Sequence, residues 1–449
     1  MAICAAKTAF NKWKKSTKSE RATILEKMGS LFEQDLERLA FLESYQTGRP
    51  IREMKAQLSR LPEWFKYYAA VLRTIEEQVR PFGENHHAFS NRMPLGVVAL
   101  ITPWNHPLLI LTKKLVPALA AGNCVVIKPS ELAPLTTIEL GRLANKAGLP
   151  KGVMNIVPGF GKEAGVALTK DKRIAKIDVT GGTETGKVIA GIAGNNLTKI
   201  SCELGGKASV LFFDDVNVDR AVNAAAFAAY IASGQTCVQG SRLLVQQSIY
   251  AEFIDKLVQK VKGIRIGDPL EPATQMGPLI SENQREIMKR YTQIGKDEGA
   301  HLIYGGKIPE EHKYGYFYEP TIFADVHNEM RIAQEEIFGP ITTIIPFKTE
   351  EEAIEIANNT EFGLAMGIWT NDVSRSLRVS EQLESGIVWV NDHHRIDPAA
   401  PWGGMKLSGI GKENGISTYL DYTHEKTVII NKSTENFDWY KEGEIQRYS

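Results

Sequence analysis

Two short segments of this 449-residue chain carry side chains suited to covalent catalysis. One is Ser233-Gly234-Gln235-Thr236-Cys237, at the end of an alanine-rich stretch, and the other is Cys202-Glu203-Leu204-Gly205-Gly206-Lys207. A cysteine is nucleophilic only as the thiolate, so it needs a nearby base or surroundings that lower its pKa. A glutamate entering a glycine-flanked turn has the backbone freedom to point into a cleft. Taken separately, a lone cysteine is more often inert core, and a lone glutamate is more often solvated surface.

No other group of reactive side chains forms a clear site. No histidine near these segments suggests a Cys–His pair, and the nine histidines lack zinc-ligand spacing, so no metal site is expected. The turn Gly181-Gly182-Thr183-Glu184-Thr185-Gly186 follows an expected strand and opens an expected helix, where backbone N–H groups can face an anion. The usual Gly-x-Gly-x-x-Gly pattern is absent from the chain. Without further context, a phosphate-binding turn and a ligand-free structural turn are equally open.

The pattern of apolar residues predicts a parallel α/β protein. The first eighty residues read as helical, with apolar positions recurring around Ile24, Met28 and Phe32. Short apolar runs then alternate with helix-length or glycine-containing segments, at 97–101, 124–128, 153–157, 174–179 and 199–203. This alternation indicates βαβ units and a sheet covered on both faces. The same alternation begins again after Gly206, where the apolar runs 210–213 and 243–246 flank an expected helix at 221–232. It predicts a second α/β domain.

Composition excludes several classes of protein. The chain is 43% hydrophobic and 24% charged, as a soluble globular protein is, and its 53 basic and 53 acidic side chains leave a formal net charge of zero. A nucleic-acid binder needs clustered excess cation, and no apolar run approaches the ~20 residues that cross a bilayer. Residues 1–19 faintly resemble a transit peptide, but Phe10 and Trp13 at helical spacing favour an amphipathic helix. Four scattered cysteines predict no disulfide framework, so the expectation is a cytoplasmic protein with reduced cysteines.

The two catalytic segments together resemble the active-site pair of the NAD(P)-dependent aldehyde dehydrogenase superfamily, with Glu203 placed 34 residues before Cys237. Further blocks extend the resemblance over nearly the whole chain. In family order they are Pro103-Trp104-Asn105-His106-Pro107, Lys128-Pro129-Ser130-Glu131, Thr180-Gly181-Gly182-Thr183, Glu335-Glu336-Ile337-Phe338-Gly339-Pro340, Trp389-Val390-Asn391, and Pro401-Trp402-Gly403-Gly404 with Ser408-Gly409. So many blocks in the right order make chance similarity negligible.

The resemblance implies a role for each motif. Cys237 would attack the aldehyde carbonyl, Asn105 would hold the oxyanion, and Glu203 would activate water against the resulting thioester. The implied cofactor is NAD, preferred over NADP, and its implied contacts are Trp104, Lys128, Glu131, Gly181, Gly182, Gly186, Glu336 and Phe338. The chain departs from the family pattern at Val179, Gly182, Cys202, Ser209 and Gln239. These departures could change the shape of the pocket and the binding of the cofactor, but none removes a group that the mechanism needs.

The implied architecture is two doubly wound parallel-sheet α/β domains plus a small oligomerisation sheet. The cofactor-binding domain is expected at 1–75 and 95–205, the catalytic domain at 206–405, the oligomerisation segments at 76–94 and 420–433, and a C-terminal tail at 434–449. The late strand 427–431 is a long apolar edge that would be hazardous if exposed. The resemblance implies that it joins a neighbouring subunit, in a homodimer or a homotetramer.

The substrate is less well specified. The segments 391–394 and 400–404 look most like the betaine-aldehyde and aminoaldehyde branch, in which Trp402 could form one wall of an aromatic cage for a quaternary ammonium group. However, His106 and Lys113 stand where that branch has aromatic residues, and Arg395 replaces a residue of its entrance loop. Lys113 and Arg395 would repel a cation and favour an aldehyde that bears a carboxylate, unless both are solvated rim residues. Broad specificity for aliphatic or aromatic aldehydes also stays open.

Two other functions fit the same fold. One is a catalytically silent structural relative, and the other is an acylating dehydrogenase that passes the thioester to coenzyme A. The retention of Cys237, Glu203 and Asn105 argues against the first, and the retention of Glu203 argues against the second.

Overall fold

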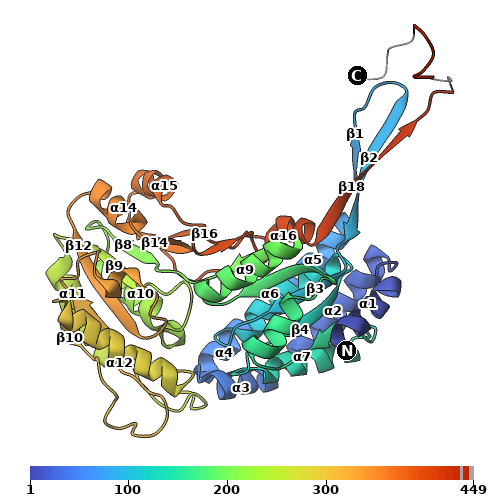
Figure 1. Ribbon diagram of the computed structural model, residues 1–449. Helices are drawn as coiled ribbons and strands as arrows, with labels where there is room; N and C mark the ends of the chain where they lie inside the picture. Colours follow the sequence, from blue (N-terminus) through green and yellow to red (C-terminus); the bar gives the residue numbers. More distant parts are fainter. Residues whose placement is uncertain (435–437, 444–449) are drawn as a thin grey trace.

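The computed structural model describes residues 1–434 and 438–443, so part of the predicted tail, at 435–437 and 444–449, lies outside the described residues. Figure 1 shows two α/β lobes and a narrow arm of strands that projects from one of them. Five helices precede the first strand, which confirms the helical reading of the first eighty residues. They are α1 (Ala2–Trp13), α2 (Lys18–Gln34), α3 (Leu36–Thr47), α4 (Ile51–Leu58) and α5 (Pro62–Thr74).

The first lobe is built on a six-stranded sheet in the order β17-β7-β6-β3-β4-β5. All five predicted strands are present and parallel, as β3 (Val97–Ile101), β4 (Cys124–Lys128), β5 (Met154–Ile156), β6 (Ile174–Thr180) and β7 (Lys199–Glu203). The sixth strand, β17 (Gly409–Ile410), returns from the C-terminal part of the chain and pairs antiparallel with β7. It was not predicted, because two residues are too short to show an apolar pattern.

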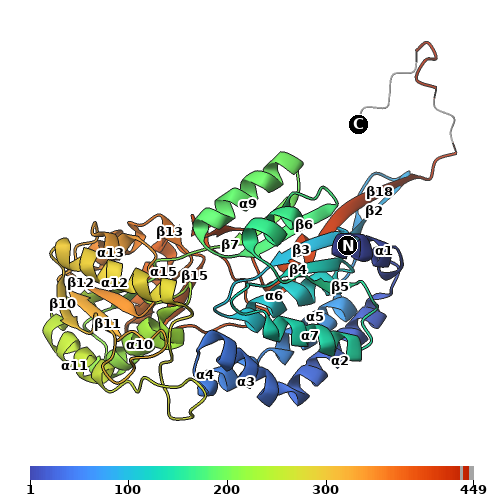
Figure 2. The ribbon, with the colours of Figure 1, turned by 60° about the horizontal axis from the view of Figure 1, so that its bottom comes forward.

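The direction of winding reverses in the middle of this sheet. From β3 the chain steps outward through α6 (Pro107–Ala120), β4, α7 (Leu135–Lys146) and β5. After η1 (Gly161–Gly165) and α8 (Val166–Thr169), it returns to the other side of β3 with β6, α9 (Thr183–Asn196) and β7. Because βαβ crossovers are right-handed, opposite steps place α9 on the other face of the sheet from α6 and α7 (Figure 2). A ligand crevice is expected where the order reverses, at the carboxyl ends of β3 and β6.

The second lobe has a seven-stranded sheet in the order β10-β11-β12-β9-β8-β14-β15, parallel except for the edge strand β10. Residues next to each other along β8 enter different apolar clusters: Val210 and Phe212 pack in one, and Leu211 and Phe213 pack in the other. Since side chains alternate across a strand, the sheet is covered on both faces. The strands are β8 (Ser209–Phe212), β9 (Arg242–Gln246), β10 (His301–Tyr304), β11 (Thr321–Ala324), β12 (Ile341–Phe347), β14 (Ala365–Trp369) and β15 (Ile387–Val390).

The remaining elements connect or cover these sheets. The helices of the second lobe are α10 (Val218–Tyr230), η2 (Ile231–Gly234), α11 (Tyr250–Lys262), α12 (Glu282–Asp297), α13 (Arg331–Gln334), α14 (Glu350–Asn358) and α15 (Val373–Gln382). A short antiparallel pair joins β13 (Phe362–Gly363) to β16 (Met405–Lys406), and α16 (Gly415–Asp421) follows. Across the described ranges, no helix combines the length and apolar character needed to span a membrane.

The projecting arm is the small sheet that the resemblance implied. It consists of β1 (Gln78–Arg80), β2 (His86–Pro94) and β18 (Thr423–Asn431), in that order and antiparallel. The predicted strand 427–431 therefore has an intramolecular partner on one side, since all nine residues of β18 pair with β2. Ile429 and Ile430 on β18 are about half exposed. The homodimer or homotetramer through this sheet stays a prediction.

Candidate functional site

Several predicted site residues lie together where the parallel strands of the first sheet end. Trp104 and Asn105 follow β3, Lys128 ends β4, the Gly181-Gly182 turn follows β6, and Glu203 ends β7. Parallel strands end at the same edge of their sheet, so residues distant in sequence meet there. A cavity of about 380 Å³ at this edge is lined by residues that include Trp104, Asn105, Lys128, Glu131, Gly181, Gly182, Cys237, Glu336 and Phe338.

Cys237 is placed by a tight turn at the amino end of β9. Ala232 and Ser233, in η2, both have φ of 54°, and Gly234 has φ of 70°. A Cβ atom at Gly234 would overlap the carbonyl oxygen of Gly339. Glycine is therefore required there on two grounds, since it accepts the left-handed conformation without penalty and leaves room for the neighbouring backbone. Non-glycine residues in this conformation cost about 1–3 kcal/mol each and persist only where surrounding contacts hold them.

Gln239 holds this turn against the segment that carries Glu336 and Phe338. Its side-chain amide donates to the carbonyl oxygens of Ala229 at 3.0 Å and Gly339 at 2.7 Å. The family pattern has a small residue at this position, so this departure adds a buried connection between the strand ends of β9 and β12.

The glycine pair after Glu203 lets three functional residues approach one another. A Cβ atom at Gly206 would lie 2.5 Å from the carbonyl oxygen of Cys237, and one at Gly205 would overlap the carboxylate of Glu336. The backbone N–H of Gly206 donates to Glu336 Oε1 at 3.1 Å. These two glycines therefore serve close packing around the site, in addition to the turn that the sequence suggested.

A second cavity, of about 240 Å³, lies on the other side of Cys237. It is lined by residues that include Glu203, His106, Lys113, Trp402 and Glu413. Cys237 is half-buried and borders both cavities. Three predicted pocket residues thus meet beside the predicted nucleophile. The fourth, Arg395, does not line this cavity: its side chain is 70% exposed and pairs with Asp392 at 3.1 Å.

Glu203 is buried in conditions that strengthen it as a base. It is 5% exposed, and neither carboxylate oxygen has a hydrogen-bond partner within the described part of the chain. Burial raises the pKa of Glu203 well above its usual value, and the charge of Glu413 raises it further, while Lys113 and Lys114 act in the opposite direction. A carboxylate with a raised pKa is a stronger proton acceptor, which suits a general base.

Cys237 needs such a base. Burial raises the pKa of its thiol to about 12, although Lys113 acts to lower it. The thiol is therefore protonated at neutral pH, and attack on a carbonyl requires that its proton be removed. Glu203 lines the same cavity and has free acceptor atoms.

Asn105 is held with its side chain toward the Cys237 turn. Its side-chain amide donates to the carbonyl oxygen of Gln235 at 3.0 Å, and its main-chain oxygen accepts from Arg49 at 3.2 Å. An amide NH₂ group has two hydrogens, so the bond to Gln235 leaves one to donate elsewhere. This arrangement suits the oxyanion role that the resemblance implied.

The first cavity has the features of a dinucleotide site. No atom lies within 4 Å of a Cβ placed on Gly181 or Gly182, so the N-terminus of α9 is open to an anion. The buried hydroxyls of Thr180 and Thr183 have no hydrogen-bond partner among the described residues. Gly186 differs from the other two glycines. A Cβ there would overlap Leu204, so Gly186 allows α9 to pack closely and does not line the cavity.

The other predicted cofactor residues lie in pairs around this cavity. Lys128 Nζ donates to Glu131 Oε2 at 3.0 Å, and the Trp104 and Phe338 rings meet edge to face with centroids 5.4 Å apart. Burial raises the pKa of Glu336 to about 7, although the Gly206 N–H and Lys207 oppose this. Among the residues described, no group of three or more His, Cys, Asp or Glu side chains is placed to hold a metal ion.

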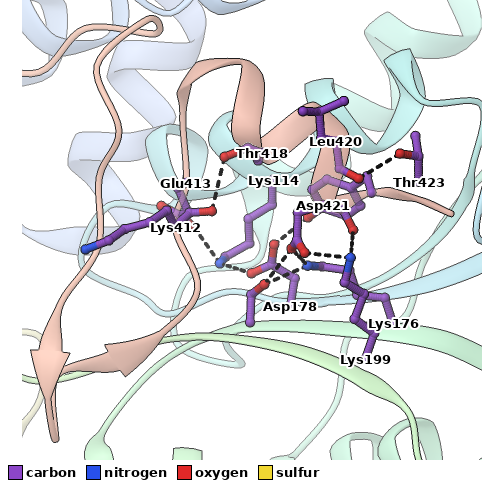
Figure 3. Close-up of polar contacts among 12 residues, drawn as sticks. Lys114, Lys176, Asp178, Lys199, Lys412, Glu413, Thr418, Leu420, Asp421 and Thr423 are labelled. Atoms are coloured by element: carbon purple, nitrogen blue, oxygen red, sulfur yellow. Dashed lines mark hydrogen bonds and ion pairs between the residues drawn. The ribbon is translucent and has the colours of Figure 1, made fainter. Parts of the chain in front are cut away.

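The structure adds a buried charge cluster that the sequence analysis missed. Lys114, on α6, forms two ion pairs (Figure 3). One is with Asp178, on β6, and the other, at 2.6 Å, is with Glu413, just before α16. Lys113 also pairs with Glu413. The segment Gly411-Lys412-Glu413-Asn414-Gly415 has the same glycine-flanked glutamate that drew attention to Glu203, and this signal could have found it.

Comparison with known proteins agrees with this geometry. The model of the aldehyde dehydrogenase family matches residues 1–428. The chain is 43% identical to the betaine aldehyde dehydrogenase of Bacillus subtilis, over 98% of this chain and 91% of that protein. It is 40% identical to the peroxisomal aminoaldehyde dehydrogenase 1 of Pisum sativum, over 98% and 90%.

Among solved structures, a betaine aldehyde dehydrogenase from Staphylococcus aureus in complex with NAD⁺ superposes with a TM-score of 0.96 at 38% identity. The superposition covers 98% of this chain and 88% of the Staphylococcus aureus chain. The family match, the identity over nearly the full length and the shared fold lead to one conclusion: the chain belongs to the aldehyde dehydrogenase family.

Proposed function

We propose that the protein oxidises an aldehyde to the carboxylic acid with NAD⁺, through a thioester on Cys237 that water hydrolyses. One observation carries the proposal: Cys237 borders both the cavity with the dinucleotide features and the cavity that contains Glu203. The reaction needs such a position, because the atom bonded to the cysteine must face a hydride acceptor on one side and a base on the other.

The residues of the site support each step. Cys237 Sγ bonds to the carbonyl carbon after loss of its proton, for which Glu203 is the acceptor within the cavity. The carbonyl oxygen becomes an oxyanion, held by the Asn105 side chain and the Cys237 N–H; one such donor is typically worth about 10²–10³ in rate. NAD⁺, when bound, accepts the hydride. Glu203 gives the Cys237 proton to solvent. It then takes a proton from the water that attacks the thioester and passes it to the departing Cys237 sulfur, so the acid leaves with the thiol restored.

The test is formation of NADH with a panel of aldehydes, with and without coenzyme A. NADH formed without coenzyme A, together with the free acid, is the expected result. Absence of NADH with every aldehyde would support a catalytically silent relative. Dependence on coenzyme A would support the acylating reaction, for which a water-activating Glu203 is not needed.

We further propose that NAD⁺ is preferred over NADP⁺ because of Glu131. Hydrogen bonds with its own backbone N–H and with Lys128 outweigh burial and lower the pKa of Glu131, so it is ionised at neutral pH. An ionised carboxylate only accepts hydrogen bonds, which suits a ribose diol. The additional phosphate of NADP⁺ would meet a repulsion of roughly 3 kcal/mol per unit charge at ~5 Å and an effective dielectric of ~20, before screening.

We expect Glu131→Ser to reduce the preference for NAD⁺. Lys128 attracts the phosphate and offsets part of the repulsion, so the parent preference is expected to be on the order of 10²-fold in kcat/KM. The serine variant removes the carboxylate and leaves Lys128, so the preference should fall toward parity. The measurement is kcat/KM for both cofactors, with Glu163→Ser, outside the cavity, as the control. A parent that uses both cofactors equally, or an unchanged ratio in Glu131→Ser, would disprove the role of Glu131.

We expect Glu413→Gln to move the acidic limb of the pH–rate profile to lower pH. Glu203 must be ionised to accept a proton from water, so turnover rises as the pH rises through the Glu203 pKa. Glu413 raises that pKa, and its removal also frees Lys113 and Lys114 to lower it further. The measurement is kcat against pH under conditions in which thioester hydrolysis limits the rate. A limb that stays in place, or moves to higher pH, would contradict the electrostatic role of Glu413.

A further inference from the structure

We propose that the substrate cavity selects aldehydes that carry an oxygen acceptor, a carboxylate above all, remote from the reacting carbonyl, through His106 and Lys113. This inference rests on the proposed function, since it names the class of aldehyde that the same site takes. It also differs from what the names of the most similar relatives suggest, because betaine aldehyde is a cation.

His106 presents a defined hydrogen-bond donor. Its Nδ1 atom lies 2.6 Å from Arg49 Nη1, and a guanidinium group can only donate. Nδ1 is therefore the acceptor, and the proton of the neutral ring is on Nε2. Gln57, on α4, lies on the same side of the ring, with its amide nitrogen 3.1 Å and its amide oxygen 3.3 Å from Nδ1. The tautomer is thus set by Arg49, in the loop between α3 and α4.

The Nε2–H of His106 has no acceptor. It is buried, the His106 residue is 3% exposed, and within the described ranges no group pairs with Nε2. Burial lowers the pKa of His106 well below its usual value, and Arg49, His394 and Lys113 lower it further, so the ring is neutral. A buried donor without a partner is costly, and a bound ligand that supplies an oxygen acceptor removes the cost. His106 lines the cavity that contains Cys237.

Lys113 covers the aromatic face that a quaternary ammonium group would use. Its Nζ atom lies over the Trp402 ring, 4.4 Å from the centroid, and pairs with Glu413. Trp402 therefore already has a cation on that face, supplied by the protein itself. A trimethylammonium group would have to displace Lys113 from both partners, and its charge would be repelled by Lys113 wherever the lysine moved.

The other charges of the cavity agree with this assignment. Arg49 pairs with Glu53, as Lys113 does with Glu413, so each carboxylate of these pairs has a cation partner. Glu203 has no such pair, and burial together with the charge of Glu413 raises its pKa. Arg60 is a further cation on the cavity lining, although it pairs with Glu63 near the surface. Among the described residues of the lining, the base Glu203 is thus the one unpaired carboxylate, and two buried donors, His106 Nε2 and the Thr180 hydroxyl, have no partner.

The test compares three aldehydes of similar size on the NAD⁺-loaded enzyme. Succinic semialdehyde carries a carboxylate, butanal carries no second polar group, and betaine aldehyde carries a quaternary ammonium. One hydrogen bond to a charged group corresponds to about tenfold to hundredfold in kcat/KM, so succinic semialdehyde should exceed butanal by at least tenfold. Betaine aldehyde should be the poorest of the three. If none of the aldehydes is oxidised, the proposed function fails; if all are oxidised equally, or betaine aldehyde is best, only this inference fails.

Variants then assign the preference to the two residues. His106→Phe removes the donor and keeps the ring size, so the ratio of kcat/KM for succinic semialdehyde to that for butanal should fall at least tenfold. His106→Gln returns an N–H donor and should recover part of the ratio, which a purely structural role would not explain. His327→Phe, an exposed histidine outside the cavity, is the matched control. A ratio that is unchanged in His106→Phe would overturn the role of His106.

Lys113→Met tests the second half of the inference. The substitution uncovers Trp402 and removes the repelling charge, so kcat/KM for betaine aldehyde should rise at least tenfold relative to butanal. Circular dichroism and cofactor binding, followed by the quenching of tryptophan fluorescence, check that the variant is folded and loaded. No rise for betaine aldehyde in a folded variant would show that Lys113 does not exclude cations.

Discussion

Replacing Cys237 with serine is expected to abolish aldehyde oxidation, whereas replacing Glu203 with glutamine is expected to stop the cycle one step later. A serine hydroxyl is far less acidic than a thiol, and the Glu203 carboxylate is too weak a base to activate it, so turnover should fall by on the order of 10⁴-fold or more. Glu203→Gln keeps the shape of the side chain and the thiol. It removes the acceptor for the proton of water, so the thioester should form slowly and then accumulate.

Single-turnover kinetics and intact-mass measurement distinguish the two variants. With aldehyde and NAD⁺ supplied, Glu203→Gln should show one slow burst of NADH and a mass increase equal to the acyl group, and Cys237→Ser should show neither. Cys4→Ser, an exposed and free cysteine on α1, is the control and should behave as the parent. Steady turnover of Cys237→Ser near the parent rate would show that another group is the nucleophile. Undiminished turnover of Glu203→Gln would show that another group is the base.

The local signals in the sequence were sufficient for most of the fold. Three strands of the first sheet, at 97–101, 124–128 and 199–203, have the bounds that the apolar runs indicated. The first two are buried and almost wholly apolar, which is the pattern of a parallel sheet covered on both faces, whereas 199–203 is mixed in character and buried only in its second half. The antiparallel edge strands β10 and β17 gave no comparable signal. β10 has only three apolar residues, all partly buried, and β17 has two residues in total.

The site was predictable where one motif carries one function, and less so where function depends on contacts distant in sequence. Cys237, Glu203 and Asn105 stood in recognisable segments. Cys237 borders both cavities, Glu203 lines the smaller cavity and Asn105 lines the larger one. In contrast, Lys114 pairs with Glu413 across 299 positions, as its neighbour Lys113 also does from one position earlier, and no spacing rule detects such a pair. Arg395 is the opposite case, a residue that was predicted to line the substrate pocket and does not. Its charge suggested that position, but its side chain extends into solvent.

Replacing Lys114 with methionine is expected to destabilise the protein by about 3–5 kcal/mol. Lys114 is fully buried between Asp178 and Glu413, which are each 2% exposed (Figure 3). Burial alone would lower the pKa of Lys114, but the two carboxylates outweigh burial and raise it, so the charge is kept. Methionine fills a similar volume and supplies no charge. Lys113 still pairs with Glu413, so Asp178 becomes the uncompensated buried carboxylate, and among the described residues only the Tyr422 hydroxyl still donates to it.

The pH dependence separates loss of charge from loss of packing. Lys113 and Lys114 outweigh burial and lower the pKa of Glu413 to about 2, so their stabilisation is present above the unfolded-state value near 4.5 and is lost as the pH falls toward 2. Lys114→Met lacks the Lys114 share of this stabilisation, so its deficit in urea unfolding should be largest at neutral pH and shrink as the pH falls. Lys187→Met, a half-exposed lysine paired with Glu184 at 2.8 Å, should cost no more than about 0.5 kcal/mol at any pH. A deficit for Lys114→Met that is independent of pH would mean that its side chain contributes packing alone, and that the charges of Asp178 and Glu413 are satisfied by other groups.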